Sequence, residues 1–439
     1  MNANSNSMPA PVFGSRPKSM AETGLPVSLL LDLLAKHLYR GGVMDLKQLI
    51  DRMALAGPII DPLIQMMRKE ARLEALGPSE TSTGPRYALT DRGRLFAAEA
   101  LTRAGYVGPA PVSLDDYTAV VKMQSVHARK VSKRRMHAAF RDVVIRESVL
   151  DRLGPALHSA RAILVHGMAG TGKTYICGQL SRVVGGGILI PHAIAVGGSI
   201  VQVFDPVVHV RADPLSSAPE PPLVLSDSTD PRYVYCNRPV VASGGELTLE
   251  MLEIQYDPVT RSSQAPSQLK AMNGLYVIDD LGRQRVRPAD LLNRWIVPLE
   301  ERIDYLTVET GQRFTVPADV ILVFSTNLDP LHLADDAFLR RLGYKIEFPV
   351  LSPEEYGAIW QQVCETRLVP FDPELLQFVF GLYKRDARPL LPCQPRDLIG
   401  IALDQSSYEE DAKSITREHL MFAWDSYFVI SRTDGATST

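Results

Sequence analysis

Residues 167–174 read Gly167-Met168-Ala169-Gly170-Thr171-Gly172-Lys173-Thr174 and follow the apolar run 162–165. They fit the pattern G-x-x-x-x-G-K-[ST], in which a strand passes through a glycine-rich turn into a helix. Glycine residues let backbone N–H groups turn inward around an oxyanion, and the helix N-terminus adds partial positive charge. The pattern therefore predicts a phosphate-binding loop, with Gly167, Gly170, Thr171 and Gly172 forming its backbone.

The two residues that end this pattern carry its chemistry. The Lys173 ammonium can reach the β- and γ-phosphates of a nucleotide, and the Thr174 hydroxyl is placed to ligate Mg²⁺. A glycine-rich strand-to-helix turn without a ligand is the alternative interpretation. Because every fixed position of the pattern is matched between a predicted strand and a predicted helix, we expect the chain to bind a nucleoside triphosphate.

Two further strands are predicted to end in polar side chains. The apolar run 275–278 is followed by Asp279 and Asp280, and the apolar run 320–326 is followed by Asn327. In nucleotide-hydrolysing sites, a first carboxylate holds the Mg²⁺ shell and a second orients or deprotonates the attacking water. We therefore predict that Asp279 is linked to the metal and that Asp280 activates water. The Asn327 amide is expected to position that water.

Composition excludes several classes of protein. The chain has 439 residues, 45% of them apolar and 22% charged, with a formal net charge of −3. A net charge this close to zero does not indicate a protein that binds nucleic acid or an anionic membrane over its whole surface, so any such contact must be local. Cys177, Cys236, Cys364 and Cys393 are widely spaced, which argues against a zinc site or a disulfide framework. The apolar segment 27–35 is too short to insert in a membrane, and the N-terminus does not resemble a secretory signal, so we expect a cytoplasmic protein.

The sequence of the N-terminal part predicts a tail over residues 1–22, followed by a small domain over 23–104. Helical patterns cover 27–39, 45–55 and 59–72, a hairpin joins 73–76 to 86–89, and Thr90 precedes another helix. This order resembles a winged-helix domain. Such domains suggest DNA binding through the helix before the hairpin, but here only the last turn of that helix is basic. A protein-docking role is favoured over DNA.

The remainder divides into three parts and a tail. Residues 105–139 are expected to form a linker with a basic run. This run either contacts nucleic acid or an acidic partner, or it is the solvated face of a helix that joins two domains. The solvated helix face is favoured. Alternating strand and helix signals over 140–350 predict a parallel doubly wound sheet, with a loop at 215–230. Residues 351–432 predict an all-helical lid, and 433–439 a short tail.

A family resemblance adds to these predictions. The hairpin pattern 305–308 and 313–316 precedes the strand 320–326, and the chain contains Ile278-Asp279-Asp280-Leu281-Gly282-Arg283-Gln284. Residues of about 140–430 resemble AAA+ ATPases of the MoxR-like clade, which have a β-hairpin before the sensor strand. With the segments 244–252 and 256–260, nearly the whole chain is similar to bacterial ATPases with predicted chaperone activity associated with Flp pilus assembly. The resemblance implies an α/β AAA+ P-loop NTPase core with a C-terminal helical lid, preceded by the winged-helix domain.

The same resemblance assigns roles to individual residues. Asn327 matches sensor 1, Arg341 matches the arginine finger with Arg340 as a close competitor, and Arg396 matches sensor 2 at the γ-phosphate. ATP and Mg²⁺ are implied as cofactors, and a finger acting on a neighbouring subunit implies a homo-oligomer, expected as a hexameric ring. Tyr256 is either a pore residue that grips a protein client or an aromatic that packs against a helix end.

One departure from the family affects the expected rate. Most AAA+ proteins have Asp-Glu where this chain has Asp279-Asp280, and aspartate is one methylene shorter. Misplacing a catalytic group by about 1 Å can cost on the order of 10²-fold in rate. Three functions therefore stay open: an ATP-driven protein remodeller with an unidentified client, a DNA-associated ATPase, and a slow nucleotide-gated scaffold. The first is favoured.

Overall fold

The computed structural model describes residues 16–78, 84–212, 229–333, 335–410 and 414–428. The predicted tail 433–439 lies outside these residues, as do positions 1–15 of the tail predicted for 1–22 and positions 215–228 of the predicted loop. The chain forms two compact units. One comprises Met1–Lys130, Val184–Ile278 and Arg283–Leu322; the other comprises Val131–Val183, Asp279–Gly282 and Val323–Thr439.

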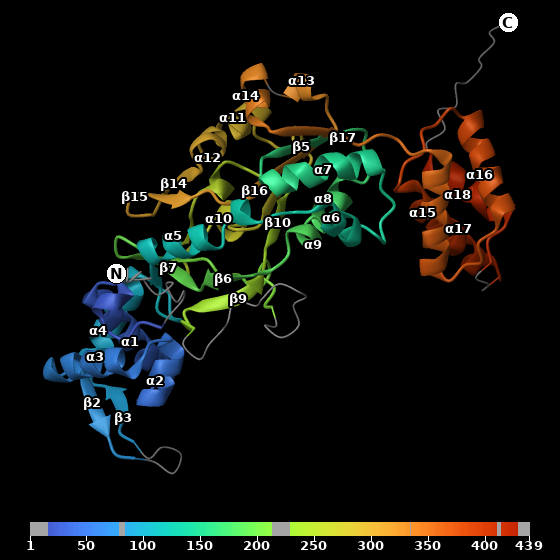
Figure 1. Ribbon diagram of the computed structural model, residues 1–439. Coiled ribbons are helices and arrows are strands. Elements are labelled where there is room, and N and C mark those ends of the chain that lie inside the picture. Colours follow the sequence, from blue (N-terminus) through green and yellow to red (C-terminus); the bar gives the residue numbers. More distant parts are fainter. Residues whose placement is uncertain (1–15, 79–83, 213–228, 334, 411–413, 429–439) are drawn as a thin grey trace, which may run out of the picture. The chain divides into compact units, whose positions relative to one another are not determined.

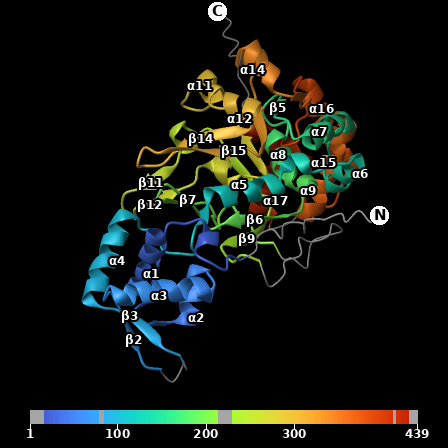
Figure 2. The same ribbon diagram turned by 60° about the vertical axis from the view of Figure 1, so that its left-hand side comes forward.

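The first unit begins with helices and a small sheet, visible at the blue end of the chain (Figure 2). The helices are α1 (Val27–Gly41), α2 (Leu46–Met53), α3 (Gly57–Lys69) and α4 (Asp91–Arg103). Strands β2 (Leu73–Leu76) and β3 (Arg86–Leu89) pair antiparallel, which confirms the predicted hairpin. The two-residue strand β1 (Met44–Asp45) was not predicted and completes a sheet of order β1-β3-β2. Assignment of this part as a winged helix stays a prediction.

Local sequence explains where these helices begin. The Asp45 carboxylate accepts from the Gln48 backbone N–H at 2.8 Å, and the Gln48 side chain accepts from the Asp45 N–H at 3.0 Å, which forms a capping box. The Thr90 hydroxyl accepts from the Gly93 N–H in the same way. Apolar side chains at helical spacing, among them Leu30, Leu34, Ile60 and Leu63, then pack into one core.

A β-rich region follows in the first unit. One sheet has the order β11-β12-β8-β7-β4, and β6 pairs antiparallel with β9. The bounds are β4 (Val112–Ser113), β6 (Gly187–Pro191), β7 (Ala193–Val196), β8 (Ser199–Gln202), β9 (Tyr233–Asn237), β11 (Gln255–Asp257) and β12 (Ser262–Gln264). Tyr256 lies on β11 and is half-buried; whether it is a pore residue or packs against a helix end stays a prediction.

The basic run predicted as one helix face is divided into separate elements. Helix α5 (Leu114–Met123) belongs to the first unit, and α6 (Lys133–Ala139) belongs to the second. The Ser113 hydroxyl caps α5 through the Asp116 N–H, and the Ser132 hydroxyl caps α6 through the Arg135 N–H. A second cap within the run starts a new helix, which is why one continuous helix does not form.

The strands expected to form the nucleotide fold belong to a five-stranded parallel sheet of order β10-β13-β16-β5-β17. They are β5 (Ile163–His166), β10 (Val240–Ser243), β13 (Leu275–Ile278), β16 (Ile321–Thr326) and β17 (Tyr344–Glu347). All residues of β13 and β16 are buried. Strands covered on both faces are nearly continuous apolar runs, so these strands were predicted from unbroken apolar runs and not from an alternation of apolar and polar residues. The hairpin β14 (Ile303–Thr307) with β15 (Arg313–Pro317) is also confirmed.

The short helices complete both units. The first contains α10 (Ser267–Lys270), α11 (Pro288–Asn293) and α12 (Ile296–Glu301). The second contains α7 (Glu147–Ser159), α8 (Lys173–Gln179), α13 (Pro330–Leu333) and α14 (Asp336–Arg341), and α9 (Ser181–Val184) follows α8.

The helices predicted for 351–432 are present in the second unit, and their role as a lid stays a prediction. They are α15 (Pro353–Arg367), α16 (Pro373–Arg385), α17 (Gln394–Glu410) and α18 (Arg417–Tyr427), which lie together in Figure 1. A capping box between Ser352 and Glu355 begins the first of these helices. Their core is rich in aromatic side chains, including Tyr356, Tyr383 and Trp424. Across the described residues, no helix has both the length and the apolar character that crossing a membrane requires.

Candidate nucleotide site

The phosphate-loop pattern occupies the turn between β5 and α8. Its three glycines have positive φ angles, 144° at Gly167, 85° at Gly170 and 82° at Gly172, which side chains with a Cβ rarely adopt. A Cβ on Gly167 would lie 2.5 Å from the Phe348 carbonyl oxygen. Backbone conformation and close packing therefore both require glycine in this turn. The predicted strand, turn and helix are confirmed as structure.

Lys173 is the first residue of α8 and is only 5% exposed. Its ammonium donates to the carbonyl oxygens of Gly167 and Met168, each at 2.9 Å, and to Asn327 Oδ1 at 2.7 Å. Burial lowers the pKa of Lys173, while the carboxylates of Asp279 and Asp280 act against this shift. A cation thus lies inside the loop, held by oxygen acceptors that a phosphate oxygen could replace.

Thr174 and Asp279 lie side by side although they are 105 positions apart in the sequence. The Thr174 hydroxyl donates to Asp279 Oδ2 at 2.6 Å, and Asp279 Oδ1 accepts from the Asp280 N–H at 3.0 Å. Thr174 is exposed and Asp279 is half-buried. A hydroxyl and a carboxylate are the hard oxygen donors that Mg²⁺ prefers, and Mg²⁺ keeps several of its waters. These two side chains therefore fit a magnesium ion.

Asp280 and Asn327 are joined by a direct hydrogen bond. Asn327 Nδ2 donates to Asp280 Oδ1 at 2.9 Å, while its Oδ1 accepts from Lys173. Asp280 has a φ of 50°, in the left-handed region that Asp and Asn tolerate better than most residues. Two hydrogen bonds hold the neighbouring backbone: Leu281 N–H donates to the Ser325 carbonyl, and the Thr326 hydroxyl donates to the Leu281 carbonyl, both at 2.7 Å. The tip of β16 thus fixes where the Asp280 carboxylate lies.

The three predicted arginines have other surroundings. Arg341 Nη1 donates to the Ala337 carbonyl in the preceding turn of α14, and Arg340 is exposed on the same helix. Arg396 pairs with its neighbour Asp397 at 3.0 Å and is 68% exposed. The structure thus brings Lys173, Thr174, Asp279, Asp280 and Asn327 into one hydrogen-bonded group, and these contacts of the arginines do not extend it. Their roles stay predictions.

One neighbour of the loop was not predicted from sequence. The turn Leu391–Cys393, just before α17, lies against Gly170 and Gly172. The sequence signal closest to it is the nearby motif Pro395-Arg396-Asp397, which predicted only Arg396. A contact between segments so far apart in the chain leaves no spacing pattern by which it could have been found.

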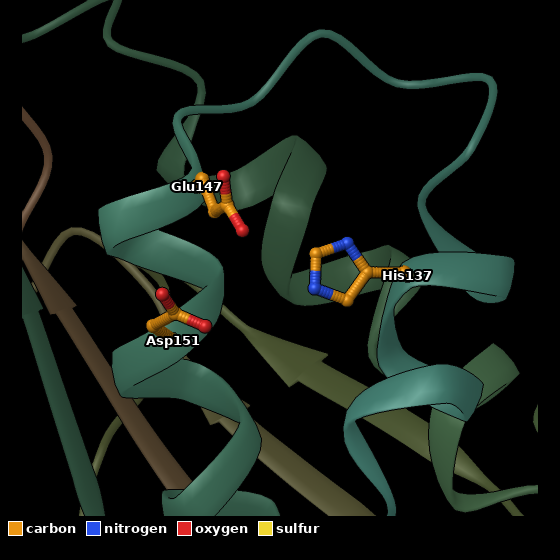
Figure 3. Close-up of side chains that lie close together, drawn as sticks. All are labelled: His137, Glu147 and Asp151. Atoms are coloured by element: carbon orange, nitrogen blue, oxygen red, sulfur yellow. The ribbon is translucent and has the colours of Figure 1, made fainter.

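A second group of ligand-type side chains lies away from the phosphate loop. Atoms of His137, Glu147 and Asp151 that could bind a metal are within 4.8 Å of one another, on α6 and α7 (Figure 3). The Lys133 ammonium already lies 2.9 Å from the Asp151 carboxylate and 3.6 Å from that of Glu147, and both acids are exposed. The carboxylates are therefore neutralised by a lysine, as in an ordinary surface ion-pair network.

A family model and several solved structures are similar to parts of this chain. A family described as a domain of unknown function (DUF8689) matches residues 352–426, within the helical lid. No curated protein sequence matches the chain. Among solved structures, NtrX from Brucella abortus is 13% identical with a TM-score of 0.38, over 75% of this chain and 61% of that one. A point mutant of RuvB from Thermotoga maritima is 11% identical with a TM-score of 0.38, over 65% and 71% of the two chains.

The chain spans 61% of the length of NtrX. A different point mutant of the same RuvB is 11% identical with a TM-score of 0.33, over 69% of this chain and 72% of that one.

Proposed function

We propose that this protein binds ATP with Mg²⁺ and hydrolyses it, as an ATPase of the AAA+ type. The observation that supports this most strongly is the hydrogen-bonded group of Lys173, Thr174, Asp279, Asp280 and Asn327. These side chains come from the start of α8 and from the tips of two strands. Together they provide a cation for phosphate, oxygen donors for a metal and a carboxylate for water. A structural turn without a ligand would need none of the three.

Each residue has a distinct role in this proposal. The Lys173 ammonium exchanges its carbonyl partners for oxygens of the β- and γ-phosphates, and the loop glycines and Thr171 wrap the same phosphates with backbone N–H groups. Thr174 and Asp279 hold Mg²⁺, whose charge stabilises the phosphate oxygens when it is bound. The Asp280 carboxylate accepts a proton from the attacking water. Asn327 orients Asp280 through its amide N–H and binds Lys173 through its carbonyl.

The proposed site is completed by arginines and by neighbouring subunits. Arg396 of the lid touches the γ-phosphate in the same subunit, and Arg341 reaches the site of the next subunit in a hexameric ring, with Arg340 as the competing candidate. This part of the proposal is supported by the family resemblance of the motif Ala337-Phe338-Leu339-Arg340-Arg341 and by the exposure of Arg340.

If Arg341 acts on the site of the neighbouring subunit, its substitution should have a specific effect on ATP turnover. Arg341→Ala is expected to keep ATP binding and to lose about 10³-fold or more of turnover, because such a cation stabilises charge on the transferred phosphoryl group. Mixing Arg341→Ala with Lys173→Ala protein should restore part of the activity, since one kind of interface then has an intact loop facing an intact arginine. Steady-state ATPase assays of the separate and mixed variants measure this. No recovery in mixed assemblies of confirmed size would contradict a shared site.

We propose protein remodelling as the biological use of this ATPase, with a protein client recruited by the N-terminal helices and hairpin. DNA is the alternative partner. On α3, the exposed side chains include Asp61 and Gln65, and the cations Arg68 and Lys69 stand only at the end. A helix that reads the major groove usually presents more donors and cations along its length. This charge distribution supports a protein partner over DNA.

The first test is the steady-state ATP turnover of the purified protein, with and without Mg²⁺ and duplex DNA. We expect turnover that requires Mg²⁺ and does not change with DNA. Stimulation by DNA that disappears at high salt would move the chain to the DNA-associated class, because phosphate contacts weaken steeply with salt. Absence of both ATP binding and turnover would contradict the proposed function as a whole.

A slow nucleotide-gated scaffold is a second candidate, and one observation favours it. Asp280 is shorter than the glutamate usual at this position, and its Oδ1 already accepts a hydrogen bond from Asn327. The shorter side chain reduces the reach of the carboxylate toward water, and the hydrogen bond to Asn327 occupies one of its two oxygens. The turnover assay separates the candidates, because ordinary enzymes turn over at roughly 1–10³ per second and a scaffold would be slower by orders of magnitude.

A further inference from the structure

The turn Leu391–Cys393 lies directly against the phosphate loop. A Cβ placed on Gly170 would be 2.8 Å from Cys393 Sγ and 3.4 Å from Leu391 Cδ1. A Cβ on Gly172 would be 3.8 Å from Pro392 Cγ. Two of the three glycines that shape the phosphate loop, Gly170 and Gly172, are thus covered by this turn. Its position decides how closely the lid packs on the part of the loop that receives phosphates.

A buried side chain closes the turn on itself. The Leu391 N–H donates to Gln394 Oε1 at 2.7 Å, and the Gln394 N–H donates to the Leu391 carbonyl at 3.2 Å. Gln394 is only 3% exposed. The turn is therefore fixed by the Gln394 amide, and any displacement of that amide moves Leu391, Pro392 and Cys393 with it.

Two tyrosines in the core of the lid hold the Gln394 amide. The Tyr383 hydroxyl donates to Gln394 Oε1 at 2.8 Å, and the Tyr356 and Tyr383 hydroxyl oxygens are 3.0 Å apart. Burial raises the pKa of both tyrosines far above neutrality, so both hydroxyls keep their protons. Since Tyr383 gives its one proton to Gln394, the Tyr356 hydroxyl must donate to Tyr383. The chain of hydrogen bonds runs in one direction, from Tyr356 to the turn.

We propose that Tyr356, Tyr383 and Gln394 are positioning residues of the nucleotide site. They hold the turn Leu391–Cys393 against Gly170 and Gly172, and through it they fix the phosphate loop in the shape that binds the phosphates of ATP. This inference rests on the proposed function. If these hydrogen bonds had a purely structural role, they would stabilise the helical lid without affecting either nucleotide affinity or the exposure of the turn.

Cys393 provides a direct readout of the turn. Cys177, Cys236 and Cys364 are buried, and Cys393 is half-buried beside Gly170. In the native protein a small thiol reagent such as DTNB should therefore react first at Cys393. The rate of that reaction reports whether the turn is held against the loop, and it does so in the absence of any nucleotide.

The variants to compare are Tyr383→Phe and Tyr356→Phe, with Tyr408→Phe as the control. Tyr408 is 88% exposed on α17. Tyr383→Phe removes the donor to Gln394, so we expect about fivefold weaker binding of fluorescent mant-ATP and about fivefold faster Cys393 labelling, the effect of one net hydrogen bond. Tyr356→Phe leaves the bond from Tyr383 to Gln394 intact and should give smaller changes in the same direction. Tyr408→Phe should match the wild type in both.

The outcomes separate this inference from the proposed function. Thermal unfolding first establishes that each variant is folded. If Tyr383→Phe is not folded, the milder variant Tyr356→Phe tests the positioning role by the same two measurements. A lower melting temperature with unchanged mant-ATP affinity and unchanged Cys393 labelling would overturn the positioning role and leave a structural one. If the wild type itself does not bind mant-ATP, the proposed function fails. If Cys393 is also labelled at the same rate in the wild type and in Tyr383→Phe, the inference that Tyr383 positions the turn is overturned as well.

Discussion

Lys173→Ala is expected to weaken ATP binding by at least about 100-fold, because the ammonium is the cation placed inside the phosphate loop. It makes hydrogen bonds to Gly167, Met168 and Asn327 at 2.7 to 2.9 Å. Exchanging two such acceptors for phosphate oxygens gives two charge-assisted bonds worth about 1.5–3 kcal/mol each. Isothermal titration of the purified variant with Mg-ATP measures the loss.

The controls for this prediction separate charge from packing. Lys173→Met keeps most of the side-chain volume in a position that is 5% exposed, so it should lose binding as Lys173→Ala does while protecting the fold. Lys384→Ala removes an exposed lysine at the end of α16 and should bind as the wild type does. Unchanged ATP affinity in Lys173→Met would show that this loop is not the nucleotide site.

Asp280→Asn is expected to reduce ATP turnover by about 10²–10⁴-fold and to leave ATP binding intact, the range typical of losing a general base. Asparagine has the same shape, tolerates the φ of 50°, and keeps a carbonyl oxygen that can accept from Asn327 Nδ2. What it loses is the basic carboxylate that takes a proton from water. Steady-state turnover and Mg-ATP affinity, measured on the same preparation, test both halves of the prediction.

Two comparisons make the Asp280 result specific. Asp279→Asn should act differently, since Asp279 bonds to the Thr174 hydroxyl and is assigned to the metal; its defect should diminish as Mg²⁺ is raised. Asp115→Asn changes an exposed acid on α5 and should leave turnover as it is. Turnover of Asp280→Asn within about threefold of the wild type would exclude Asp280 as the group that activates water, because loss of a general base costs about 10²-fold or more.

The elements around the proposed site were predictable because each depends on a few adjacent residues. Glycine spacing at 167, 170 and 172 specifies the turn, and runs of buried apolar residues specify β5, β13 and β16. The β1 strand was missed because two residues give no pattern. The break between α5 and α6 was missed because Ser132 looked like one more polar residue in a basic run, although its hydroxyl caps a new helix.

Consecutive residues were enough to specify which side chains end the strands and the phosphate loop, since a strand tip or a glycine turn is encoded locally. Which of those side chains meet depends on the folded chain. The bond from Thr174 to Asp279 spans 105 positions, and that from Lys173 to Asn327 spans 154. The turn Leu391–Cys393 covers Gly170 and Gly172 from a distant part of the chain. Such contacts follow from how helices and strands pack, and packing depends on the whole chain rather than on any local spacing.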